Sequence, residues 1–314
     1  MSSGLMEARP WRRWLAGSAL ALVLAACGGG VSQFEPFVPQ RMFAFGDESS
    51  LLLPGGRKYA VNVLGEDGEL DCRAQPVWTQ GLAASFGFVF EECNPAGLEP
   101  RAFMRAAVGA KIDDLAAQID VQVAEGGYNS KDLTMVMLGT HDVLELYEQY
   151  PARSADELLV EARQRGNRLG LQIDRLVLLG ARIIVVTIPD LGLTPYALAQ
   201  RALFPDTDRA ALLTQLTAQL NAGIRVRILN DGRYIGLVLG DEMSQAMVDR
   251  PGNFALTNAT TGVCATPLPL CSTATLVDGG NALTYLWADD LRLAFTGHQY
   301  LTTLADTRAR NNPF

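Results

Sequence analysis

The chain has 314 residues, of which 48% are hydrophobic, and its formal net charge is −8 at neutral pH. A chain of this length and composition is typical of one large globular domain with a sizeable core. The acidic balance argues against nucleic acid, and against anionic lipid headgroups, as the main partner.

The first 26 residues have the pattern of a secretory signal peptide. Arg9, Arg12 and Arg13 precede an apolar run at 14–26 that is too short to span a bilayer, and Cys27 follows two small residues. A buried helix followed by a Gly-rich tail is the competing interpretation. The Arg12-Arg13 pair leaves twin-arginine export open beside the general secretory route.

The residues around Cys27 resemble the cleavage site of bacterial lipoproteins. That resemblance implies that Cys27 becomes the lipidated first residue of the mature protein, and several acyl chains anchor a protein firmly in a membrane. Because no Asp follows Cys27, we expect the cell outer membrane, on its periplasmic or its surface face. Residues 27–40 are rich in Gly and Pro and predict a tether, and residues 41–314 predict the folded domain.

From residue 41 onward the sequence alternates between predicted strands and predicted helices. In chain order these are a strand at 41–45, helices at 76–87 and 111–123, a strand at 133–138, a helix at 154–179, a strand at 182–188, a helix at 207–229, a strand at 234–239 and a helix at 296–309. The alternation predicts an α/β fold with a parallel sheet that helices cover on both faces. A ligand site is then expected at the carboxyl ends of the strands.

Four cysteines remain besides Cys27, an even number for an oxidising compartment, and they allow three pairings. We favour Cys72–Cys93 and Cys264–Cys271, because each bridge closes a local loop flanked by turn residues. A zinc site is the competing interpretation, but the cysteine spacings fit no common ligand pattern and the chain has two histidines. We therefore predict no metal and no cofactor.

Three short segments carry the polar residues of greatest interest: 45–49 (FGDES), 139–142 (GTHD) and 289–292 (DDLR). In order and spacing they resemble the GDSL, or SGNH, ester hydrolases, in which Ser follows Gly-Asp, Asn precedes Asp in G-x-N-D, and His closes D-x-x-H. The resemblance covers nearly all of residues 41–309. It implies a three-layer α/β/α sandwich with a five-stranded parallel sheet of flavodoxin-like order, and a pocket for acyl esters of lipid or glycan.

The residue types that carry the chemistry of that family are exchanged in this chain. In the family, Ser attacks an ester, His removes the Ser proton, and an Asp three residues earlier orients the His. Glu48 stands at the place of the nucleophile, and a carboxylate that attacked an ester would yield an anhydride. Ser49 lies one residue later, so it replaces the nucleophile only if the turn is remodelled; otherwise it is a turn or N-cap hydroxyl. Arg292 stands at the place of the base but stays protonated, while Asp289 keeps the place of the orienting acid.

Two further residues correspond to the oxyanion hole of the family. His141 stands where the family has Asn, and it is either a hydrogen-bond donor to an oxyanion or a hydrogen-bonded loop histidine. Gly109 is the candidate backbone donor, with a simple turn glycine as the alternative. His298, six residues beyond Arg292, is expected to be a packed helix histidine rather than a rescuing base.

Two functional hypotheses follow for the domain. It is either an envelope-anchored ester hydrolase with a rearranged site and weak or no turnover, or a non-catalytic binding or scaffolding lipoprotein that uses the same pocket. In both cases Glu48 and Arg292 inherit the places of a hydrogen-bonded Ser–His pair. We therefore predict that they form a carboxylate–guanidinium ion pair, with Asp289 as the second acceptor of Arg292.

Overall fold

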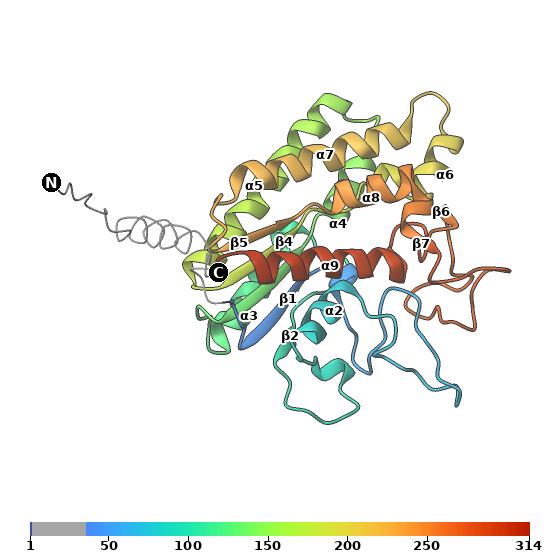
Figure 1. Ribbon diagram of the computed structural model, residues 1–314. Helices are drawn as coiled ribbons and strands as arrows, with labels where there is room; N and C mark the ends of the chain where they lie inside the picture. Colours follow the sequence, from blue (N-terminus) through green and yellow to red (C-terminus); the bar gives the residue numbers. More distant parts are fainter. Residues whose placement is uncertain (2–35) are drawn as a thin grey trace. The chain divides into compact units, whose positions relative to one another are not determined.

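Five parallel strands form the central sheet of the computed structural model, which describes Met1 and residues 36–314 (Figure 1). The strands lie in the order β2-β1-β3-β4-β5. Their bounds are Arg41–Gly46 for β1, Ala102–Met104 for β2, Asp132–Met137 for β3, Arg182–Val186 for β4 and Ile235–Val238 for β5. This is the predicted flavodoxin-like order. Cys27 and the rest of the signal and tether up to residue 35 lie outside the described residues, so the lipid anchor stays a prediction.

The inner strands are apolar on both faces because helices cover both faces of the sheet. Every residue of β3 is buried, as are all but the first of β4. The pairing of β1 with β3 runs from Arg41 beside Asp132 to Gly46 beside Met137. Strand β2 was not among the predicted elements, because three residues are too few to give a periodic signal.

Two layers of helices cover the sheet, which completes the three-layer α/β/α sandwich (Figure 1). One layer contains α2 (Trp78–Ser85) and α9 (Phe295–Asn311), which pack against each other. The other contains α3 (Leu115–Ala124), α5 (Ala155–Leu178) and α7 (Arg209–Arg227). Right-handed crossovers between neighbouring parallel strands give this distribution.

Helices α5 and α7 run side by side with their backbones unusually close (Figure 1). A Cβ atom on Gly166 would lie 1.9 Å from the carbonyl oxygen of Leu220, and one on Gly223 would lie 2.4 Å from that of Arg163. Both positions therefore require glycine. Helix α5 begins as predicted, with Ser154 accepting the N–H of Glu157 in a capping box.

Three further helices lie beyond the carboxyl ends of strands: α4 (Thr140–Tyr147) follows β3, α6 (Pro195–Leu203) follows β4, and α8 (Gly240–Asp249) follows β5. None of them was among the predicted helices, and each has ten residues or fewer. The helix predicted at 111–123 begins instead with a 3-10 turn, η4 (Ile112–Asp114), before α3.

Two long loop segments, 51–76 and 256–290, lie side by side and contribute Val61, Val263 and Cys271 to a second, smaller core. The second segment contains the short pair β6 (Asn258–Gly262) and β7 (Tyr285–Trp287). Both predicted disulfides are present, Cys72–Cys93 and Cys264–Cys271, which confirms the local pairing.

The side chain and the backbone of Asn62 join the two loop segments. The Asn62 side chain donates to the carbonyl oxygens of Pro269 at 2.9 Å and Cys271 at 3.0 Å, and its backbone N–H also donates to Cys271 at 3.0 Å. The Asn62 carbonyl accepts the N–H of Thr273 at 2.8 Å. Because Asn62 is fully buried, these bonds are shielded from water and tie one loop to the other.

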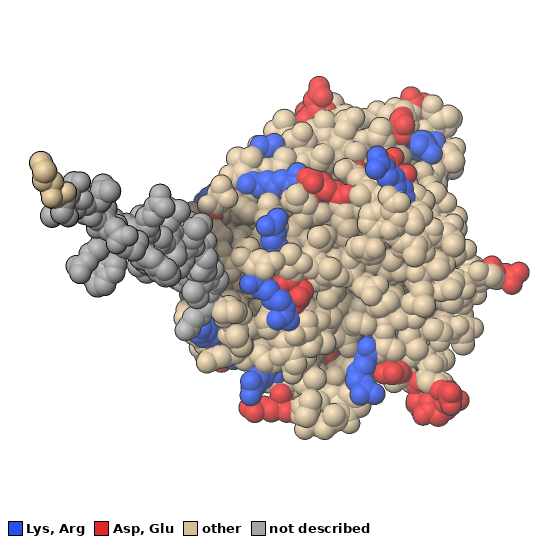
Figure 2. All heavy atoms as spheres, viewed as in Figure 1, with Lys and Arg blue, Asp and Glu red and all other residues tan. Residues whose placement is uncertain are grey.

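Charged side chains of both signs are interspersed on the face of the molecule shown in Figure 2. Many of the arginines pair with a nearby carboxylate, such as Arg310 with Asp306 at 2.9 Å and Arg233 with Asp231 at 2.6 Å. Within residues 36–314, no helix combines the length and the apolar character that a membrane span needs.

Candidate functional site

The site is built on the short turn that follows β1. Gly46 has φ 141°, and a Cβ there would lie 2.4 Å from the carbonyl oxygen of Met137, so only glycine lets the strand leave the sheet in this way. Asp47 caps the next turn, η2 (Glu48–Ser50), by accepting the N–H of Ser49 at 2.9 Å. This local geometry directs Glu48 to the carboxyl edge of the sheet.

The Glu48 carboxylate is the centre of the site, and it is buried with 2% of the side chain exposed. Its Oε2 accepts the backbone N–H of Gly109 at 2.9 Å. The Nε2 atom of His141, at the start of α4, lies 2.9 Å from both carboxylate oxygens. The Nε of Arg292 donates to Oε1 at 3.1 Å, and Nη2 of Arg292 donates to the same oxygen. The predicted ion pair between Glu48 and Arg292 is therefore present.

Arg292 also binds Asp289, as predicted. Its Nη1 donates to Asp289 Oδ2 at 2.8 Å, while Oδ1 of Asp289 accepts the backbone N–H groups of Leu291 at 2.9 Å and Arg292 at 2.7 Å. The guanidinium carbon lies 5.8 Å from the ring centre of Tyr59, a residue that the sequence interpretation did not include. A Tyr in a long loop carries no sequence signal for such a contact.

The charges of the site favour an ionised Glu48. Burial raises the pKa of Glu48, but the hydrogen bonds from His141 and Gly109 and the charge of Arg292 outweigh burial and hold this pKa well below its ordinary value. The hydrogen bond to Glu48 raises the pKa of His141 against the effect of burial, which favours the positively charged imidazolium. The cluster is therefore a set of fixed, compensating charges.

Asp47, beside Glu48, is a second buried acid. Complete burial and the neighbouring charge of Glu48 raise the pKa of Asp47 from 3.8 to about 6. The capping bond from Ser49 acts in the opposite direction but is weaker. An acid that titrates near neutral pH inside the site was not predicted, because burial of a particular side chain is not visible in the sequence.

Neither Ser49 nor His298 takes the place of the missing triad members. The backbone N–H of Ser49 donates to Asp47 in the turn, and neither histidine hydrogen-bonds to the Ser49 side chain, because His141 contacts Glu48 and His298 contacts Trp78. His298 is buried in α9, where its Nδ1 accepts the N–H of Trp78 at 3.3 Å, and burial lowers its pKa to about 3. His298 is therefore the packed helix histidine that we expected.

The site differs from the Ser–His–Asp arrangement that the family resemblance implies. No histidine lies beside Ser49 to act as its base, and the guanidinium of Arg292 cannot accept a proton. Both expected oxyanion donors, the Gly109 N–H and His141, are directed at the Glu48 carboxylate. Among residues 36–314, no group of three His, Cys, Asp or Glu side chains is placed to hold a metal ion.

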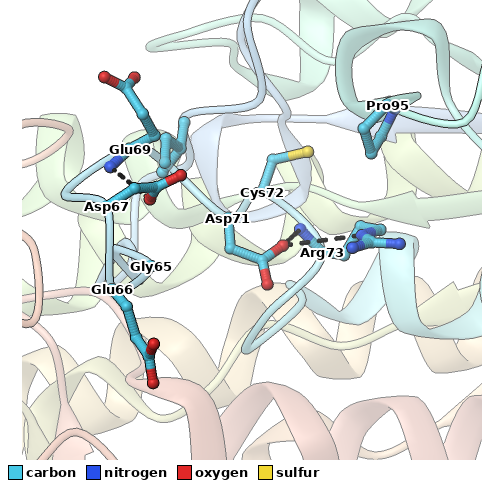
Figure 3. A pocket seen from close by; sticks show the side chains of 9 residues that line it. Gly65, Glu66, Asp67, Glu69, Asp71, Cys72, Arg73 and Pro95 are labelled. Carbon is cyan, nitrogen blue, oxygen red and sulfur yellow. Dashed lines mark hydrogen bonds and ion pairs between the residues drawn. The ribbon is translucent and has the colours of Figure 1, made fainter.

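A separate surface cavity of about 450 Å³ lies on the first loop segment, beside the Cys72–Cys93 bridge (Figure 3). Several carboxylates line it, yet two of them serve the loop itself: Asp67 accepts the N–H of Glu69 at 3.0 Å, and Asp71 accepts that of Arg73 at 3.1 Å. These bonds stabilise turns and indicate no ligand.

Comparisons with known proteins identify the family of the chain. A family model described as GDSL-like lipase/acylhydrolase matches residues 43–232, whereas the comparison with curated proteins finds no match. One similar solved structure is a member of the lipolytic G-D-S-L family from Veillonella parvula, with 11% identity, a TM-score of 0.43, and coverage of 84% of this chain and 95% of that chain. Another is an acetyl xylan esterase from Geobacillus stearothermophilus, with 15% identity, a TM-score of 0.42, and coverage of 87% and 95%. Since the family model spans more than half of the sequence, the chain belongs to the GDSL-like lipase/acylhydrolase family.

Proposed function

We propose that this chain is a lipid-anchored GDSL-family protein that keeps the pocket of an acyl-ester hydrolase and turns esters over weakly or not at all. The observation that carries the proposal is the ion pair of Glu48 with Arg292, at the places where the family has its nucleophile and its base. Loss of such residues lowers the rate by on the order of 10⁴ to 10⁶. The ligand class that fits the family pocket is an acyl ester of lipid or glycan.

A second candidate is a binding or scaffolding lipoprotein without any turnover. It is favoured by the contacts of the Glu48 carboxylate, which accepts the Gly109 N–H and lies 2.9 Å from His141 Nε2. A substrate carbonyl at the same place would find both donors already engaged. The two candidates differ in whether a measurable ester hydrolysis remains.

An assay with short p-nitrophenyl esters distinguishes these cases. The wild type should hydrolyse them at a rate close to that of buffer alone. Glu48→Ser and Arg292→His should each recover little, because nucleophile and base act as a unit, whereas the double variant should be clearly more active than either. Ordinary esterase turnover in the wild type, lost in Ser49→Ala, would contradict the proposal.

Membrane attachment through Cys27 is the second part of the proposal, and it is supported by the sequence around the cleavage site. Radiolabelled palmitate should enter the full-length protein in a Gram-negative host, and the label should fractionate with the outer membrane. Cys27→Ser should abolish the labelling. Incorporation that survives this change would remove the anchor from the proposal.

A further inference from the structure

The exchanges at His141 and Arg292 alter the kind of anion that the site suits. An ordinary oxyanion hole uses neutral donors, which stabilise a charge that appears only during the reaction. Here the guanidinium of Arg292, the imidazole of His141 and the Gly109 N–H all contact the Glu48 carboxylate. Fixed positive charge stabilises an anion that is already fully charged in the ground state.

We propose that the Gly109 N–H, His141 and Arg292 form a binding site for a small carboxylate, and that the side chain of Glu48 is its resident ligand. This inference rests on the proposed function, because both require that the site performs little chemistry. The external ligands of the same class are monocarboxylates such as acetate, the acid part of a simple acyl ester.

The contacts of Glu48 are those that a bound carboxylate needs. Oxygen Oε2 has the Gly109 N–H at 2.9 Å and Oε1 has Arg292 Nε at 3.1 Å, while His141 Nε2 is equally close to both oxygens at 2.9 Å. With 2% of the side chain exposed, water contributes little to this coordination. A buried carboxylate is stable only when it is paired and hydrogen-bonded in this way.

The Glu48 carboxylate is part of the chain itself, and this explains why the wild type should not bind free carboxylic acids at the site. Glu48 is held beside its donors by the backbone of η2, which Asp47 caps. A ligand held in this way acts at an effective concentration far above the millimolar range at which a free carboxylate would be supplied. External acetate can therefore occupy the site only when the Glu48 carboxylate is removed.

The same argument predicts weak turnover. A site that binds a fully charged carboxylate stabilises the ground state and the acid product rather than the transition state. The pKa of Glu48 lies below its ordinary value, which agrees with strong preference for the charged form. The donors of the family oxyanion hole have thus become the donors of a permanent anion site.

Two substitutions of Glu48 form a matched pair for the test. Glu48→Ala removes a –CH₂–COO⁻ group, which has the same heavy atoms as acetate, and leaves the donors in place. Glu48→Gln keeps the shape of the side chain and fills the site with a neutral amide. Each variant, and the wild type, is titrated with sodium acetate against sodium chloride at the same ionic strength, by calorimetry and by thermal unfolding.

We expect saturable acetate binding by Glu48→Ala, at least tenfold tighter than by the wild type or by Glu48→Gln, and a melting temperature that rises with acetate. Adding Arg292→Ala to Glu48→Ala should remove this binding. If Glu48→Ala behaves alike in acetate and chloride, the inference is wrong. Should this variant fail to fold in chloride, its folded yield in acetate provides the same comparison. Ester turnover by the wild type would refute the proposed function, whereas unchanged behaviour of Glu48→Ala in acetate and chloride would refute the carboxylate site alone, so the two failures can be told apart.

Discussion

Replacing Arg292 by Ala should destabilise the domain, because it removes the cation that pairs with two carboxylates of the site. Glu48 and Asp289 would lose their shared guanidinium, and Asp47 lies next to Glu48 in the chain. His141 would remain as the nearby counter-charge. Loss of one partner from a buried ion pair costs about 3–5 kcal/mol.

The exposure of Arg292 places the expected loss at the lower end of that range. The Arg292 side chain is 20% exposed, whereas that of Glu48 is 2% exposed. The variant therefore leaves a buried Glu48 carboxylate without its partner, but the guanidinium that it removes was partly hydrated. We expect the free energy of unfolding to fall by about 3 kcal/mol. For a domain of this size each kcal/mol corresponds to roughly 2–4 °C, so the melting temperature should fall by about 6–12 °C.

Urea and thermal unfolding of matched variants measure this loss. Arg233 provides the control, since it pairs with Asp231 at 2.6 Å but is 65% exposed, and Arg233→Ala should cost far less stability than Arg292→Ala. The double variant Glu48→Ser with Arg292→His should be more stable than Arg292→Ala, because it removes the Glu48 carboxylate as well as the guanidinium that pairs with it. The reasoning is refuted if Arg292→Ala is no less stable than Arg233→Ala, or if the double variant is as unstable as Arg292→Ala.

Three other predictions concern stability. Because the folded pKa of Asp47 is raised to about 6, the stability that its protonated form contributes is fully present below the unfolded pKa and is lost as the pH rises through 6. The free energy of unfolding of Asp47→Asn, relative to that of the wild type, should therefore be about 1 kcal/mol more favourable at pH 8 than at pH 5. The same difference at both pH values in urea unfolding would contradict this. Changing Cys264 and Cys271 to Ser should lower the free energy of unfolding by about 2 kcal/mol, since the bridge closes a short loop, and an unchanged urea midpoint would show that the bridge adds nothing. Gly166→Ala should lower the free energy of unfolding by about 1–3 kcal/mol, because the new methyl group would lie 1.9 Å from the backbone of α7. In the control Gly252→Ala, the new methyl group meets no atom within 4 Å. Equal losses of stability for the two variants in thermal unfolding would refute the packing argument.

The parts of the fold that the sequence predicted are those with strong local signals. The β-branched run of β4 and the start of α5 after Ser154 appear in the structure where the sequence indicates them. Strand β2 lacks such a signal because it has three residues and depends on its partner β1 for its conformation. The short helices α4, α6 and α8 were missed for a similar reason, since tertiary packing rather than periodicity stabilises them.

At the site, the order of the motifs predicted that Glu48 and Arg292 meet across 244 residues of sequence. It did not predict that His141 and Gly109 turn toward the same carboxylate, because an oxyanion donor was expected to face a ligand. The contact with Tyr59 and the burial of Asp47 were also missed. These features depend on distances between loops, which no local pattern encodes.

The buried amide of Asn62 has a consequence for how the loop segments open. Because its hydrogen bonds join 51–76 to 256–290, neither segment can detach without exposing the polar groups of the other. The two segments should therefore behave as one cooperative unit in native-state hydrogen exchange, with backbone amides such as those of Asn62 and Thr273 exchanging at a common free energy. A partner that bound to either loop segment would then change the opening free energy of both.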